Sequence, residues 1–143
     1  MKNFLLIIFV IIIGISCKDN TPPPATPIQE LPEDFVVFYK KFLADSAYQM
    51  NHILFPLAGL PSQANPETDD LDNFRWKKDA WTLHRDFDPK TSGFDRSFVL
   101  VSDELIIEYI IHTSHKFGLE RRFSKSDGKW YLIYYSGVNE IKK

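Results

Sequence analysis

The sequence contains a single cysteine, Cys17, among 143 residues, so no disulfide can form within the chain. It also lacks the Gly-x-Ser-x-Gly motif of serine hydrolases and the glycine-rich motifs that bind phosphate groups. Lysine and arginine together number 17 against 19 acidic residues, which gives a formal net charge of -2. No basic stripe stands out, so nucleic-acid binding is not expected. No motif assigns a catalytic residue.

Metal-binding patterns are equally sparse. His112 and His115 are three positions apart, and on a strand they would point to opposite faces and could not share an ion. The acidic run Asp69-Asp70-Leu71-Asp72 lacks the spacing of a calcium-binding EF-hand loop. The sequence therefore predicts neither a metal nor an organic cofactor.

The amino terminus has the order of a secretory signal. Lys2 precedes an unbroken apolar run from Phe4 to Ile13, and small residues follow before Cys17. This run is shorter than the roughly 20 residues that a membrane-spanning helix needs. The stretch Gly14-Ile15-Ser16-Cys17 resembles the lipobox of bacterial lipoproteins, in which the signal is cleaved before the cysteine and the cysteine is acylated.

This resemblance implies a division of the chain into three parts. Residues 1–16 would be the signal peptide, residues 17–31 an acylated cysteine with a proline-rich tether, and residues 32–143 a single domain. Acyl chains on Cys17 would attach the protein to the membrane as an outer-membrane lipoprotein of the cell envelope. Lys18-Asp19-Asn20 looks like a surface-export signal of Bacteroidetes lipoproteins, which leaves both the periplasmic and the outer side open.

The sequence predicts one amphipathic helix over residues 31–49, followed by a short strand at residues 52–57 that ends near Pro56. The apolar stripe of the helix comprises Phe35, Phe38, Tyr39, Phe42 and Leu43, which recur at spacings of three and four. Residues 58–73 are predicted to form a long polar loop. Residues 73–88 fit either a helix or a strand.

The carboxyl-terminal third has the pattern of four strands at residues 97–101, 105–113, 116–125 and 129–138. Asp127-Gly128 is a typical two-residue hairpin turn, and it predicts the pairs Ser126–Lys129, Phe123–Leu132 and Arg121–Tyr134. One face would carry Phe117, Leu119, Arg121, Phe123, Trp130, Leu132 and Tyr134, and the other Glu120, Arg122, Tyr131, Ile133 and Tyr135. The first face is the candidate core.

This order of elements resembles the cone-shaped nuclear transport factor 2-like fold, which ketosteroid isomerases and scytalone dehydratases share. The segments DFVVFYKKFLADSAYQMNHILFPL, WKKDAWTLHRDF and ERRFSKSDGKWYLIYY are similar to an uncharacterised family of Bacteroidetes lipoproteins with that fold. The resemblance implies an α+β domain in which an amino-terminal helix packs on a strongly curved antiparallel sheet and encloses a cavity. It implies no known activity.

The preferred function is binding of a small molecule or a partner protein. A pocket would be lined by Trp76, Trp81, His84, Tyr109, Arg121, Trp130 and Tyr134, although each tryptophan can equally belong to the core. Arg121 lies among apolar residues, so it needs a paired acid or a ligand if it is buried; otherwise it must extend its head to water.

Two other functions remain open. An enzyme that resembles ketosteroid isomerases would need a buried carboxylate as a base, for which Asp79 is available, with Tyr109 or Tyr134 as hydrogen-bond donor and His84 as a second base. A structural scaffold, such as a homodimer, would use Tyr131, Ile133 and Tyr135 as its interface. Catalysis is the minority interpretation.

Overall fold

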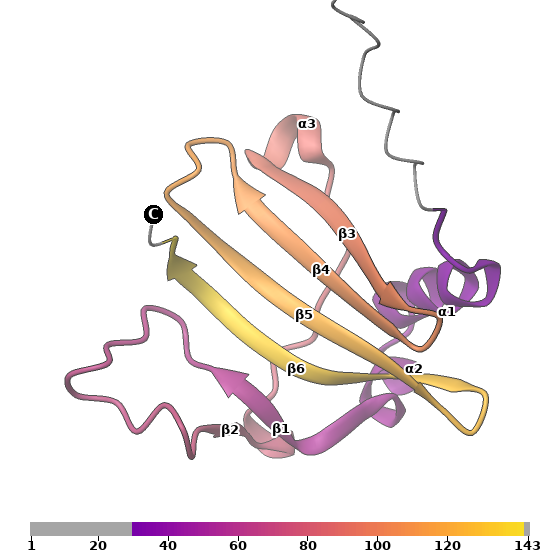
Figure 1. Ribbon diagram of the computed structural model, residues 1–143, viewed down its shortest axis with the longest axis horizontal. Helices are drawn as coiled ribbons and strands as arrows, with labels where there is room; N and C mark the ends of the chain where they lie inside the picture. Colours follow the sequence, from indigo (N-terminus) through magenta and orange to yellow (C-terminus); the bar gives the residue numbers. More distant parts are fainter. Residues whose placement is uncertain (1–29, 142–143) are drawn as a thin grey trace, which may run out of the picture.

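The computed structural model describes residues 30–141. One six-stranded sheet runs in the order β2-β1-β6-β5-β4-β3 (Figure 1). The helices are α1 (Glu33–Ala44), α2 (Ser46–Asn51) and α3 (Pro89–Ser92), and the strands are β1 (Ile53–Leu60), β2 (Arg75–Trp76), β3 (Phe94–Ser102), β4 (Leu105–His112), β5 (Phe117–Ser126) and β6 (Lys129–Glu140). The predicted signal peptide, Cys17 and most of the predicted tether lie outside the described residues.

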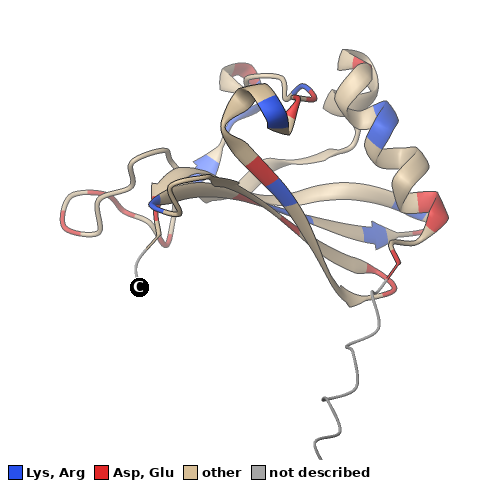
Figure 2. Ribbon diagram, turned by 90° about the horizontal axis from the view of Figure 1, so that it is seen from above, with Lys and Arg blue, Asp and Glu red and all other residues tan. Residues whose placement is uncertain are grey.

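The sheet is curved, and α1 and α2 lie on one of its sides (Figure 2). We call this side the helix face and the opposite side the open face. Within residues 30–141, no helix is long and apolar enough to cross a membrane.

The predicted single helix over residues 31–49 is wrong at one point, because the structure divides it into α1 and α2 at Asp45. Asp45 has an extended backbone, and its carboxylate accepts a hydrogen bond from the Tyr48 N–H. An aspartate in this conformation caps the start of a new helix better than it continues the old one. The apolar stripe of α1 is confirmed, since all five of its predicted members are buried.

The first strand differs from the prediction in length and in direction. β1 continues past Pro56 to Leu60, and it runs parallel to β6 while it pairs antiparallel with β2. The sheet is therefore mixed rather than wholly antiparallel. Pro56 lies between Ile53 and Ala58, where the register of β1 against β6 shifts. A proline is tolerated there because the interrupted ladder does not require its missing N–H.

The predicted hairpin is confirmed at the turn and wrong farther along the strands. Ser126 pairs with Lys129 and Phe123 with Leu132, but the register then shifts, so that Arg122 faces Tyr134 and Arg121 faces Tyr135. Ile133 is the extra residue of this β-bulge, and a bulge reverses the sides of the side chains that follow it, here as far as the second register shift between Ser136 and Asn139.

The bulge therefore exchanges the two tyrosines between the faces. Tyr134 lies on the open face, where the guanidinium of Arg122 sits 4.3 Å from its ring centroid. Tyr135 lies on the helix face, against the rings of Trp76 and Trp81. The predicted placement of Tyr134 on the core face and of Tyr135 on the outer face is thus wrong.

The core lies between α1 and the helix face of the sheet. The ring of Phe123 is surrounded by four aromatic rings of α1, namely Phe35, Phe38, Tyr39 and Phe42, at centroid distances of 5.5 to 5.8 Å. Trp130 is also buried there, and its Nε1–H donates to Asp34 Oδ2 at 3.0 Å. This cluster closes the narrow end of the space between helix and sheet.

Candidate ligand pocket

A buried ion pair stands at the centre of the helix face. Glu108 on β4 and Arg121 on β5 are direct cross-strand partners, and they are 0% and 2% exposed. Arg121 Nη2 donates to Glu108 Oε1 at 3.1 Å, and Arg121 Nε lies 2.8 Å from Oε2. The Nε–H is not aligned with that oxygen, so the second contact is ionic rather than a hydrogen bond. The arginine head has an acid partner and does not extend to water.

Glu108 contacts three side chains, two through hydrogen bonds and one through an ionic contact. Besides Arg121, the Tyr39 hydroxyl donates to Oε1, and Arg96 Nε approaches the same oxygen to 3.0 Å. Arg96 also contacts Asp86 at the surface, where Nη2 and Oδ1 are 2.8 Å apart. Burial raises the pKa of Tyr39 far above its ordinary value, against the opposing charge of Arg121 and with the support of Glu108, so its hydroxyl stays a donor.

His84 extends this network toward the cavity. Its Nδ1 lies 3.3 Å from Arg121 Nη1. A guanidinium can only donate, so Nδ1 must accept and the ring proton must sit on Nε2. Burial, assisted by the positive charge of Arg121, lowers the pKa of His84 from 6.5 to about 3. His84 is therefore neutral at physiological pH and offers an Nε2–H donor.

We expect the free energy of unfolding to decrease as the pH falls below the unfolded-state pKa of His84. Because the pKa is 6.5 when unfolded and about 3 when folded, the unfolded chain binds an additional proton between these values. The stabilisation is complete above pH 6.5 and is lost progressively toward pH 3. Urea unfolding between about pH 7 and about pH 5 should show this slope, and His84→Asn should flatten it. Equal slopes in the two proteins would contradict the assignment.

The segment that carries His84 is held by Gln49, which is 0% exposed on α2. Gln49 Oε1 accepts the His84 backbone N–H at 2.8 Å, and Gln49 Nε2 donates to the carbonyls of His84 at 2.8 Å and Phe42 at 2.7 Å. The side-chain amide of Gln49 thus satisfies the backbone N–H and carbonyl of His84, which a neighbouring strand would otherwise do. No motif marks Gln49, so the sequence analysis missed it.

A cavity of about 440 Å³ opens between this segment and the wide end of the sheet. It is lined by Leu83, His84, Arg85, Phe87, Ser92, Phe94, Ile110, Leu119, Arg121, Tyr135 and Val138. We call it the cone pocket. Its walls are mostly apolar, and His84, Arg121 and Tyr135 form one polar cluster within it. Mostly apolar walls with a few polar groups are typical of small-molecule sites.

The structure brings together only part of the predicted pocket. His84 and Arg121 line it. Trp81 and Trp76 lie behind its wall. The ring centroids of Trp81 and His84 are 4.7 Å apart, and those of Trp76 and Tyr135 are 5.2 Å apart. Trp130 belongs to the core. The sequence missed Tyr135 as a lining residue because the bulge was not foreseen.

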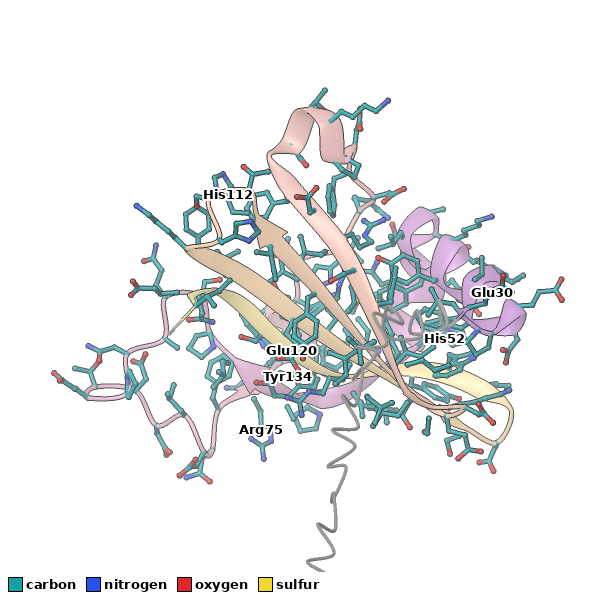
Figure 3. All side chains as sticks on the ribbon, turned by 45° about the horizontal axis from the view of Figure 1, so that its top comes forward. Glu30, His52, Arg75, His112, Glu120 and Tyr134 are labelled. Carbon is teal, nitrogen blue, oxygen red and sulfur yellow. The ribbon has the colours of Figure 1, made fainter. Side chains whose placement is uncertain are left out.

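Tyr109 and Tyr134 lie on the open face instead. Tyr109 pairs with Glu120 across β4 and β5, and Glu120 and Tyr134 lie close together in Figure 3. The proposed isomerase set does not assemble, because Asp79 is exposed in the short helix Lys78–Ala80 and both tyrosines are on the other side of the sheet. The carboxylate that is buried beside a tyrosine is Glu108.

The predicted interface of Tyr131, Ile133 and Tyr135 is also divided. Tyr131 stacks on His52 with ring centroids 5.6 Å apart, Ile133 forms the bulge, and Tyr135 lines the cone pocket. Among residues 30–141, no group of three or more His, Cys, Asp or Glu side chains is placed to hold a metal ion.

No protein-family profile matches the sequence, and no curated protein matches it. Similar solved structures do exist. A nuclear transport factor 2-like protein of Bacteroides fragilis has a TM-score of 0.51 and 18% identity over 79% of this chain and 50% of that chain. A cystatin-like protein of Bacteroides caccae has a TM-score of 0.53 and 24% identity, over 73% and 75% of the two chains.

A protein of Bacteroides ovatus is similar to the same degree, with a TM-score of 0.51 and 23% identity over 73% of this chain and 74% of that one. The chain spans half the length of the B. fragilis structure. At these identities the likeness concerns the fold. The predicted α+β fold of the nuclear transport factor 2-like type is therefore confirmed.

Proposed function

We propose that this chain, which has a nuclear transport factor 2-like fold, is a binding module that holds a small molecule in the cone pocket. The observation that carries the proposal is the cavity of about 440 Å³, with apolar walls and the cluster of His84, Arg121 and Tyr135. Its volume falls within the range of about 300–1,000 Å³ that is usual for ligand sites.

Binding is favoured over catalysis by the state of the buried carboxylate. Glu108 Oε1 is contacted by Tyr39, Arg96 and Arg121, and Oε2 by Arg121. A general base must reach the proton that it removes. Because both oxygens of Glu108 face basic or donor groups of the chain, neither is directed at a ligand in the pocket.

Filling the cavity should weaken binding. We expect Leu119→Trp to weaken the binding of phenylnaphthylamine, a neutral probe that fluoresces in apolar surroundings, by about tenfold or more, because the indole would occupy the space between β5 and the opposite wall. Fluorescence titration of the full chain measures this. Ile107→Trp is the matched control, since Ile107 lies on β4 one strand away and on the open face.

The control variant should bind the probe as the unchanged chain does. Equal binding by the Leu119→Trp variant and the unchanged chain, with both proteins folded by thermal unfolding, would contradict a role for the cone pocket. Such a result would place the probe elsewhere on the molecule.

We further propose that Cys17 is acylated and anchors this module to the cell envelope as an outer-membrane lipoprotein. The lipobox-like stretch before Cys17 supports this proposal, and two or three acyl chains give stable membrane attachment where one does not. We expect Cys17→Ser to move the protein from the membrane fraction to the soluble fraction, as measured by immunoblotting. Ser16→Ala, which keeps a small residue at the cleavage site, should leave it in the membrane; unchanged attachment of the serine variant would refute acylation at Cys17.

A further inference from the structure

The polar groups of the cone pocket are all able to donate hydrogen bonds. His84 offers Nε2–H, because Arg121 occupies Nδ1. Arg121 and Arg85 have only donors, and the hydroxyls of Tyr135 and Ser92 can donate as well as accept. The residues that line the pocket include no aspartate and no glutamate. The pocket is therefore suited to an acceptor and not to a cationic ligand.

These three side chains form a compact cluster. Arg121 and Tyr135 are direct partners across β5 and β6, and the rings of His84 and Tyr135 are 4.6 Å apart between centroids. Among residues 30–141, no protein group bonds to His84 Nε2 or to the Tyr135 hydroxyl. Donors that stay unpaired under a bound apolar molecule would cost free energy, so a wholly apolar ligand fits poorly.

The charged side chains near the cluster also favour an anion over a cation. Arg96 and Arg121 share the single buried carboxylate of Glu108. The second acid of the network, Asp86, has a side chain that is 69% exposed and contacts Arg96 rather than Arg121. Neither acid lines the pocket, whereas Arg85 and Arg121 do, so the charged side chains that face it are basic.

We infer that the ligand of the cone pocket is an organic anion, an apolar body that ends in a carboxylate, whose oxygens accept from Arg121, His84 and Tyr135. This inference rests on the proposed binding function and narrows it to one chemical class. The apolar body would lie against Ile110, Leu119 and the neighbouring walls. Charge-assisted hydrogen bonds of this kind are about twice as strong as neutral ones.

The test is displacement of phenylnaphthylamine from the full chain by three compounds with one alkyl body: octanoate, octanol and octylamine. A parallel titration of the Leu119→Trp variant measures the probe fluorescence that arises outside the cone pocket, and this signal is subtracted. We expect octanoate to displace the probe at a concentration about tenfold lower than octanol, with octylamine weakest.

Two neighbouring tyrosines supply the matched variants. Tyr135→Phe should weaken octanoate by about tenfold and leave octanol unchanged, because it removes one donor and keeps the ring that packs on Trp76 and Trp81. Tyr134→Phe, on the open face, should change neither compound. This pair keeps the test valid even if variants of Arg121 do not fold.

The possible failures are distinct. If the probe binds and octanol displaces it as well as octanoate does, the anionic ligand is refuted while small-molecule binding stands. The same holds if octylamine is the strongest competitor or if Tyr135→Phe leaves the octanoate preference intact. If the probe does not bind, the proposed function fails and this inference fails with it.

Discussion

We expect Glu108→Gln to lower the free energy of unfolding by about 3–5 kcal/mol, because it removes the buried acid that pairs with Arg121 and Arg96. The amide keeps the size of the side chain, so the loss would come from charge rather than from a cavity. Arg121 is 2% exposed and cannot turn its head to water without repacking. Urea unfolding followed by tryptophan fluorescence measures the change.

Glu120→Gln is the control for this prediction. Glu120 forms an ion pair with Arg122 on the open face, and the two side chains are 22% and 43% exposed. A partly exposed pair of this kind contributes about 0–1 kcal/mol. If the two variants lower the free energy of unfolding by similar amounts, the buried ion pair is not required for stability. The role of the network would then lie in ligand binding alone.

The sequence predicted the parts of the fold that local patterns determine. The stripe of α1 follows from spacings of three and four, and the Asp127-Gly128 turn sets the first two pairs of its hairpin. The break at Asp45 was within reach as well, since an aspartate followed by Ser46 is a common helix start. These features involve residues close together in the chain.

The pocket depends on contacts that local patterns do not encode. The bulge at Ile133 lies where β1 docks parallel to β6, and it decides that Tyr135 rather than Tyr134 enters the pocket. The wall that carries His84 has no regular structure and is placed by the Gln49 amide, 35 residues away in the chain. A sequence pattern cannot express such a tertiary contact.

One member of the network could have been found in advance. Glu108 alternates with Ile106 and Ile110 along β4, so it stands on an apolar face as Arg121 does on β5. An acid and an arginine on the buried faces of adjacent strands are candidates for a pair, because each needs a partner of opposite charge. The sequence analysis considered the arginine and overlooked the glutamate.

The second large loss of stability is expected in the aromatic cluster between α1 and the sheet. Phe123→Ala should lower the free energy of unfolding by about 3–5 kcal/mol, because it removes a fully buried ring from the centre of four aromatic rings of α1. The loss combines the lost burial with the cavity that remains, since the backbones of α1 and the sheet can collapse only in part. Thermal and urea unfolding both report it.

Arg122→Ala is the matched control, one residue earlier on the same strand and on the open face, where we expect about 0–1 kcal/mol. The pair also separates the two ends of the domain. Phe123 does not line the cone pocket, so a Phe123→Ala protein that still folds should bind phenylnaphthylamine with its affinity nearly unchanged. A small stability loss together with lost binding would show the opposite arrangement: a pocket that depends on the aromatic cluster and a fold that does not.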